Sequence, residues 1–90
     1  MAEILKTDGT REPFDLGPEE TQLRTMQAAV GGYIEAVTLR DSRVLVCNEE
    51  GKMLGLARNA AATTLLHEAG GSRSDYIVGD ALLCAAGELT

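Results

Sequence analysis

Short apolar segments alternate with polar, glycine-containing turns along the 90 residues of this chain, and this pattern predicts several short strands and helices. At the N-terminus, residues 2–6 and 11–16 flank a turn that contains Gly9, an order that predicts a β-hairpin. Pro13 lies in the second strand of this hairpin. Because proline has no backbone N–H to donate, we expect that strand at an edge of the sheet.

The next segment carries the signals of a helix. Pro18 fits the first turn of a helix, where its missing N–H costs nothing, and the carboxylates of Glu19 and Glu20 stabilise the positive end of the helix dipole. Apolar side chains then recur at helical spacing, and two glycines end the segment as glycine commonly ends a helix. The expected core stripe is Leu23, Met26 and Val30, followed by Gly31 and Gly32.

The middle of the chain predicts strands. Residues 33–40 alternate loosely and are rich in β-branched and aromatic types, so they favour a strand. Residues 43–47 form a nearly continuous apolar run, which is typical of a central strand covered by helices on one or both faces. The polar segment 48–51 predicts a turn, with Gly51 where positive φ is needed, and residues 52–56 are expected to return as a strand.

A second helix is predicted from Asn59 to about Glu68. Asn59 is a good N-cap, and the alanines that follow it favour helix formation. Gly70 and Gly71 are expected to end the helix because glycine tolerates the left-handed conformation after a last turn. The side chains expected to face the core are Ala61, Leu65 and Ala69.

The C-terminal part predicts a loop at residues 72–75, a strand at 76–78, a break and a last strand at 81–85. The elements then follow in the order ββαββαβ(β), which defines an α+β fold: a small single domain with a mixed or antiparallel sheet packed with two helices. The chain is long enough for one such domain. We therefore expect a single domain over residues 1–90, with a candidate hairpin at 1–16 and a core at 17–90.

Composition and charge limit the partners of this domain. The net charge is −6 with eight Lys and Arg residues, so no direct nucleic-acid binding is expected, since such binding depends on cations that neutralise phosphates. An acidic chain can instead meet a basic protein surface. The few aromatic residues and the small size favour a homo-oligomer. No window approaches a membrane span, and no signal sequence is recognised, so we expect no membrane association and a cytoplasmic location.

The cysteines and the single histidine do not form a recognisable metal or catalytic motif. Cys47 and Cys84 each lie in an apolar run, as buried free thiols do, and burial removes nucleophilicity by raising the thiol pKa. A disulfide between the two cysteines is possible only if their strands pair. His67 lies in the last turn of the second predicted helix, where a cation is favourable. We therefore expect no metal, no cofactor and no catalytic residue.

Polar residues at strand and helix ends are the candidates for ligand or partner contacts. An acidic cleft is one reading of Glu35, Glu49, Glu50 and Asp80, and solvated turn charges are the other. The segment 48–52 is either a hairpin turn without function or part of a site for a small polar ligand. The candidate binding residues are Tyr33, Glu35, Arg43, Asn48, Glu49, Arg58, Asn59 and Asp80.

Several segments in order resemble a known family. These are Met26 and Gln27, the VGGYIE sequence at 30–35, the VCNEEGK sequence at 46–52, Asn59 with Ala62 and Thr63, and the DYIVGDA sequence at 75–81. Together they are similar to a family of phage and bacterial mobile-element proteins called domain of unknown function 3846. The alanine-rich segment 57–66 departs from this pattern. The resemblance implies a phage or plasmid accessory protein, located in the host cytoplasm if phage-encoded, and it assigns no catalytic residue.

The function that we expect is a noncatalytic binding protein of a phage or mobile element. It modulates or antagonises a host defence system through an acidic protein-binding surface that meets a basic partner. One alternative is a sponge that sequesters a nucleotide signal, with Arg43, Lys52, Arg58 and Arg73 as phosphate donors. A second alternative is a small carboxylate-dependent enzyme with Glu35 or Asp80 as general base.

Overall fold

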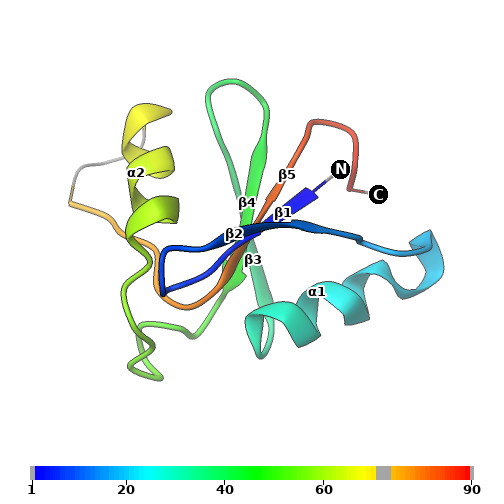
Figure 1. The fold of residues 1–90 in the computed structure, drawn as a ribbon, viewed down its shortest axis with the longest axis horizontal. Helices are drawn as coiled ribbons and strands as arrows, with labels where there is room; N and C mark the ends of the chain where they lie inside the picture. Colours follow the sequence, from blue (N-terminus) through cyan, green and yellow to red (C-terminus); the bar gives the residue numbers. More distant parts are fainter. Residues whose placement is uncertain (1, 71–73, 90) are drawn as a thin grey trace.

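The elements of the protein confirm the predicted α+β class. A computed structural model describes residues 2–70 and 74–89, and Figure 1 shows the arrangement of its strands and helices. Their bounds are Ala2–Leu5 (β1), Arg11–Phe14 (β2), Gln22–Val30 (α1), Ile34–Thr38 (β3), Val44–Asn48 (β4), Ala60–Glu68 (α2) and Ala81–Cys84 (β5). A 3-10 turn at Glu19–Thr21 precedes α1.

The strands form one five-stranded sheet in the order β2-β1-β5-β4-β3. Every neighbouring pair is antiparallel. The first and last strands of the chain are therefore neighbours at the centre of the sheet, with Glu3 opposite Leu83. Pro13 lies in β2 at one edge, as predicted, and β3 forms the other edge.

The two helices cover opposite faces of the sheet, and each face has its own core cluster (Figure 1). One cluster joins α2 to Leu5, Leu45, Cys47 and Leu83 through Ala62 and Leu66. The other joins α1 to Ile4, Val46, Leu82 and Cys84 through Met26 and Val30. Successive residues of β4 thus point to opposite apolar layers, which explains the continuous apolar run in that strand. Cys47 and Cys84 are both free and buried, and they lie in different clusters.

Helix α1 buries two of the three predicted core residues, Met26 and Val30, whereas Gln22 takes the place expected for Leu23. Leu23 is 54% exposed, whereas Gln22, Met26 and Val30 are buried. Gln22 is accommodated in this position because its Nε2 donates a 3.0 Å hydrogen bond to the backbone oxygen of Glu88, and a satisfied amide can be buried at little cost. The helix ends at Gly31, whose φ of 82° is the left-handed C-cap that the sequence predicts.

The segment after β4 is a series of turns, so the predicted strand at residues 52–56 is wrong. The amide of Gly51 donates to Asn48 O, that of Leu54 to Glu50 O, and that of Leu56 to Gly51 O. These local bonds use the backbone groups that a strand would offer to a neighbour. The predicted strand at 76–78 is likewise reduced to one bridge, between Val78 and Arg58.

Gly51 is required for space and does not have the positive φ that the sequence suggested. A Cβ atom at this position would lie 2.7 Å from Val78 Cγ2 and 3.3 Å from Asn48 O. The glycine therefore allows the turn after β4 to pack directly against the segment that leads into β5. Gly55, further along the same turn, does have a positive φ of 71°.

Helix α2 begins as predicted, with Asn59 as its N-cap. Its buried residues are Ala62, Thr63 and Leu66, one position beyond the predicted face, with Leu65 and Ala69 packed at the side of the core. Ala61 is only half-buried. The helix ends before Gly70, whose φ is 90°, and the predictions for Gly71 and for residues 72 and 73 lie outside the described residues. Across residues 2–70 and 74–89, none of the helices has the length and apolarity to span a bilayer.

Candidate functional site

The larger of two neighbouring hollows lies on the α2 face of β3 and β4 and is called here the Tyr76 cleft. It has a volume of about 280 Å³. Strands β3 and β4 form its floor, the turns after β4 supply one wall, and the segment before β5 supplies the other. Its lining residues are Glu35, Val37, Cys47, Asn48, Lys52, Asp75, Tyr76, Ile77 and Val78.

Two cations surround the aromatic ring that names this cleft. Lys52 Nζ lies 4.2 Å from the centre of the Tyr76 ring, and Arg58 Cζ lies 4.6 Å from the same centre. Lys52 Nζ also lies 2.7 Å from Asp75 Oδ1. This contact lowers the pKa of Asp75 and raises that of Lys52. Because both side chains are about half exposed, solvent screens the pair and it contributes little to stability.

Glu35 and Cys47 meet at the floor of the Tyr76 cleft. Cys47 Sγ lies 3.9 Å from Glu35 Oε1 and 3.7 Å from the backbone oxygen of Glu35. Burial, together with the negative charge of Glu35, raises the pKa of Cys47 to about 11. The thiol is therefore protonated at neutral pH and acts as a weak donor to the carboxylate. This agrees with the prediction of an unreactive thiol.

The second hollow, called here the Tyr33 groove, lies where the C-terminal end of α1 meets the turns after β4. Its volume is about 250 Å³, and its lining residues are Gln27, Gly31, Gly32, Tyr33, Asn48, Glu50 and Leu54. Tyr33 is 67% exposed and Leu54 is 59% exposed. Met53, beside Leu54, is 76% exposed. Large apolar side chains in such exposed positions commonly mark a contact surface.

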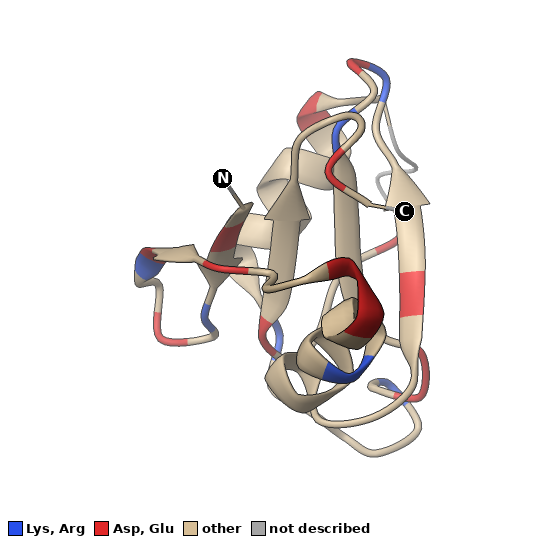
Figure 2. Ribbon diagram, turned by 90° about the vertical axis from the view of Figure 1, so that its right-hand side faces the viewer, with Lys and Arg blue, Asp and Glu red and all other residues tan. Residues whose placement is uncertain are grey.

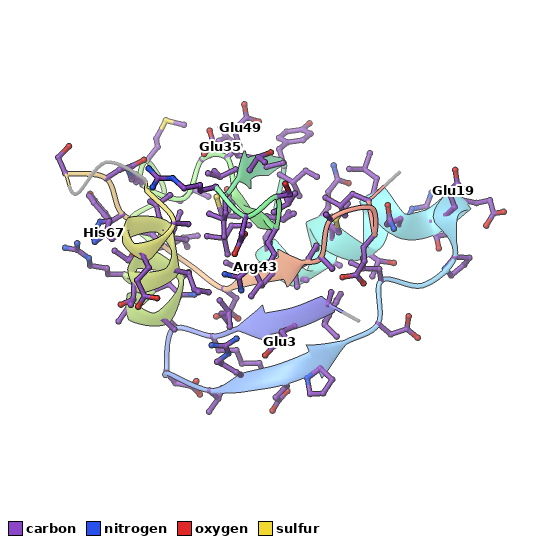
Figure 3. The ribbon with its side chains drawn as sticks, turned by 90° about the horizontal axis from the view of Figure 1, so that it is seen from above. Glu3, Glu19, Glu35, Arg43, Glu49 and His67 are labelled. Atoms are coloured by element: carbon purple, nitrogen blue, oxygen red, sulfur yellow. The ribbon has the colours of Figure 1, made fainter. Side chains whose placement is uncertain are left out.

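Acidic side chains border the Tyr33 groove. Glu50 lines it, and Glu49 is held next to Tyr33 by a 2.8 Å bond from its backbone N–H to Tyr33 O. Figure 3 shows Glu35 and Glu49 on the same side of the molecule, whereas Glu3 and Glu19 lie elsewhere. Among residues 2–70 and 74–89, no cation forms an ion pair with Glu35, Glu49 or Glu50.

Asn48 separates the two hollows and is fixed in place. Its Nδ2 donates to Val30 O at 3.1 Å, and its Oδ1 accepts from Glu50 N at 2.8 Å. The side chain is buried, and it joins the end of β4 to the end of α1. The structure thus brings together Tyr33, Glu35, Asn48 and Glu49 of the predicted site, with Asn48 as the shared wall.

The remaining predicted site residues lie in other positions. Asn59 is fully buried and bonds to three backbone groups. Asp80 Oδ1 accepts a 3.0 Å bond from Thr7 N. Arg43 pairs with Asp41 at 2.8 Å, in the turn between β3 and β4. Of the proposed phosphate donors, only Lys52 and Arg58 lie together, and Arg73 is outside the described residues.

The sequence did not predict four of the residues that line the two hollows, namely Asp75, Tyr76, Gln27 and Leu54. Asp75 and Lys52 are far apart in the chain, and no periodicity connects them. The one available signal was Tyr76 itself, since the chain has only two tyrosines and one phenylalanine. In the part of the chain that the structure describes, no three His, Cys, Asp or Glu residues are grouped as metal ligands would be.

These features define a small α+β domain with one antiparallel sheet between two helices and two adjoining surface hollows. Comparison with family models shows that the chain belongs to the family described as domain of unknown function (DUF3846), whose model matches residues 2–90. The match includes the N-terminal hairpin as well as the segments that carry the resemblance in the sequence. Neither a search of curated proteins nor a search of solved structures found a match.

Proposed function

We propose that this protein is a noncatalytic binding module that engages a protein partner through the Tyr33 groove and its acidic border. In a phage or mobile element, this partner belongs to a host defence system that the module modulates or antagonises. The observation that carries the proposal is the exposure of Tyr33 and Leu54, which line one groove, with the exposed Met53 next to Leu54 in the chain.

The apolar part of this surface fits a protein anchor. Protein interfaces concentrate their binding energy in a few aromatic and large apolar residues, which are surrounded by polar groups. Tyr33 and Leu54 face a groove of about 250 Å³, which has room for one or two side chains of a partner. The groove wall is firm, because Asn48 is bonded on both sides.

The charged part of the surface favours a basic partner. Glu49 and Glu50 are exposed and form no ion pair within residues 2–70 and 74–89. The whole chain has a net charge of −6, which steers cationic partners towards it over about a Debye length. A basic surface with a protruding apolar side chain has the matching chemistry.

The test is capture of a partner from a bacterial lysate by the immobilised full chain, compared across matched variants. A Tyr33→Ser variant and a Glu49→Gln, Glu50→Gln double variant should each lose at least tenfold of the captured protein. The control is a Glu19→Gln, Glu20→Gln double variant, which removes the same charge away from the groove and should retain capture. Equal capture by all of the variants would refute the proposed surface, and so would capture that does not weaken as salt rises.

A second candidate function, sequestration of a small anionic ligand such as a nucleotide, is supported by the Tyr76 cleft. Lys52 and Arg58 both lie within 5 Å of the Tyr76 ring centre, and an aromatic ring with neighbouring cations suits a base with its phosphates. Native mass spectrometry of the protein purified from cells with an active nucleotide-signalling defence decides between the two. A retained nucleotide supports the cleft, and an empty protein supports the groove.

A further inference from the structure

The free edge of β3 has the hydrogen-bonding groups that a further strand needs. The bonds that flank the strand run from Glu49 N to Tyr33 O and from Leu39 N to Arg43 O. Tyr33 and Leu39 therefore point their backbone groups towards β4. Since bonding direction alternates along an antiparallel strand, the N–H and C=O groups of Ile34, Ala36 and Thr38 point outward.

No strand of the described sheet lies beyond this edge, and its side chains do not block it. β3 is the last strand in the sheet order. In Figure 2, no described strand lies on the outer side of the strand at the right-hand edge of the sheet. Its sequence is IEAVT, without proline and with a single charge. Natural proteins usually protect such an edge with proline, several charges or a covering segment.

The opposite edge of the sheet is protected in this way. The hydrogen bond from Lys6 N to Thr10 O shows which residues of the hairpin bond to each other. In the observed register, the backbone groups of Arg11 and Pro13 are the ones on β2 that point away from the sheet. Pro13 has no N–H to offer there, and Arg11 is held by Glu3 in a bidentate pair. Of the two edges of the described sheet, β3 therefore offers the longer run of free backbone groups for pairing.

We propose that β3 pairs antiparallel with β3 of a second copy of this chain, forming a two-fold dimer with a continuous sheet across both subunits. The register follows from the outward groups. When Ala36 lies opposite the partner's Ala36, Ile34 lies opposite the partner's Thr38, and all of the outward groups bond, giving roughly six hydrogen bonds. A shift of the partner strand by two residues in either direction leaves roughly four.

The charges and the small side chain on β3 favour this register and favour a second copy of the chain as the partner. With Ala36 at the centre, Glu35 lies opposite the partner's Val37, whereas one of the shifted registers places Glu35 directly opposite its own copy. The small alanine side chain is exposed and permits close approach on the two-fold axis. Antiparallel pairing also brings Arg40, at one end of the strand, towards the acidic end of the partner, where Glu49 is bonded to Tyr33. Because β3 pairs with its own copy about a two-fold axis, the interface is used up in the dimer and association does not continue into a fibre.

The experiment combines the subunit count of the unmodified chain with two matched cysteine variants. Sedimentation velocity of the full chain should show a dimer that dissociates on dilution and that becomes more populated as salt screens the like net charges. An Ala36→Cys variant should form an intersubunit disulfide rapidly, because opposed residues at such a position have Cα atoms about 5.5 Å apart, within disulfide range. A Thr38→Cys variant is the control, because its two copies are roughly 14 Å apart in this register.

The expected result is crosslinking of Ala36→Cys at least tenfold faster than that of Thr38→Cys, with no contribution from the buried Cys47 and Cys84. Both substituted positions are exposed, so both variants should fold, and far-UV circular dichroism confirms this. A monomer at the highest attainable concentration would overturn the proposal. So would equal crosslinking of the two variants, which would indicate random collision. The proposal does not depend on the partner-binding function, since Ala36 lines neither hollow.

Discussion

Replacing Asn59 with alanine should destabilise the protein more than any surface substitution on the same helix. Asn59 is completely buried, although it is polar. Its Oδ1 accepts from Ala62 N at 3.1 Å, and its Nδ2 donates to Leu5 O at 2.8 Å and to Gly79 O at 2.9 Å. One side chain thus connects the first turn of α2, the end of β1 and the approach to β5.

The magnitude follows from these three bonds. Loss of the cap interaction costs about 1 kcal/mol. Each buried carbonyl that loses its donor adds about 1 to 1.5 kcal/mol, so the sum is roughly 3 to 4 kcal/mol. A domain of this length has a free energy of unfolding of about 5 to 13 kcal/mol. The variant should therefore lose a large part of its stability, and it should recover about 1 kcal/mol when serine is used, because serine keeps the cap.

The assay is urea denaturation followed by far-UV circular dichroism, since the chain has no tryptophan. The unmodified chain, Asn59→Ala and Asn59→Ser are compared with Thr64→Ala, an exposed position on α2, which should change stability by less than about 0.5 kcal/mol. A loss below about 1 kcal/mol for Asn59→Ala would refute the reasoning. If serine matched asparagine, the two Nδ2 bonds would contribute nothing.

Two further predictions concern packing and pH. Gly51→Ala should cost about 1 to 3 kcal/mol because its Cβ would lie 2.7 Å from Val78 Cγ2; in a double-mutant cycle Val78→Ala should relieve part of that cost, and additive losses would contradict the clash. The pKa values of Cys47 and Cys84 are both raised from the ordinary value of 9.0 to about 11. The folded state therefore favours the neutral thiols. Their contribution to stability is complete below pH 9 and is lost as the pH rises towards 11. Urea midpoints across this range should fall less for the Cys47→Ala, Cys84→Ala double variant than for the unmodified chain, and parallel pH profiles would disprove the linkage.

The fold was largely predictable because local signals and the global fold agree. Pro13 predicted an edge strand, Asn59 a helix cap, and Gly31 a helix end, and each prediction is confirmed. These residues act through their own backbone geometry or hydrogen bonding, which the sequence shows directly. On α1, Met26 and Val30 are buried as predicted, and only the prediction for Leu23 was wrong. Gln22 is buried in its place because the backbone oxygen of Glu88, distant in sequence, accepts a hydrogen bond from the glutamine amide.

The two hollows were only partly predictable. Tyr33, Glu35, Asn48 and Glu49 lie in or next to β3 and β4, so their proximity follows from the pairing of two strands that the sequence predicts one after the other. The other wall of the Tyr76 cleft depends on the turns after β4, where a strand was expected. Those turns place Lys52 in contact with Asp75 and with the Tyr76 ring. They form because Gly51 packs where no side chain fits. Steric exclusion by a residue distant in sequence leaves no trace in local propensity.

The proposed dimer and the proposed partner surface adjoin each other, and the effect of salt on each association distinguishes them. In the dimer register, Tyr33 lies opposite the partner subunit's Leu39, and any effect of groove occupancy on β3 pairing is matched by an equal effect of pairing on groove occupancy. Their electrostatics have opposite signs. Two copies with a net charge of −6 each repel, and salt strengthens their association, whereas a basic partner is attracted, and salt weakens its binding. A salt series on the dimer and on the captured complex therefore assigns each interaction to its own surface.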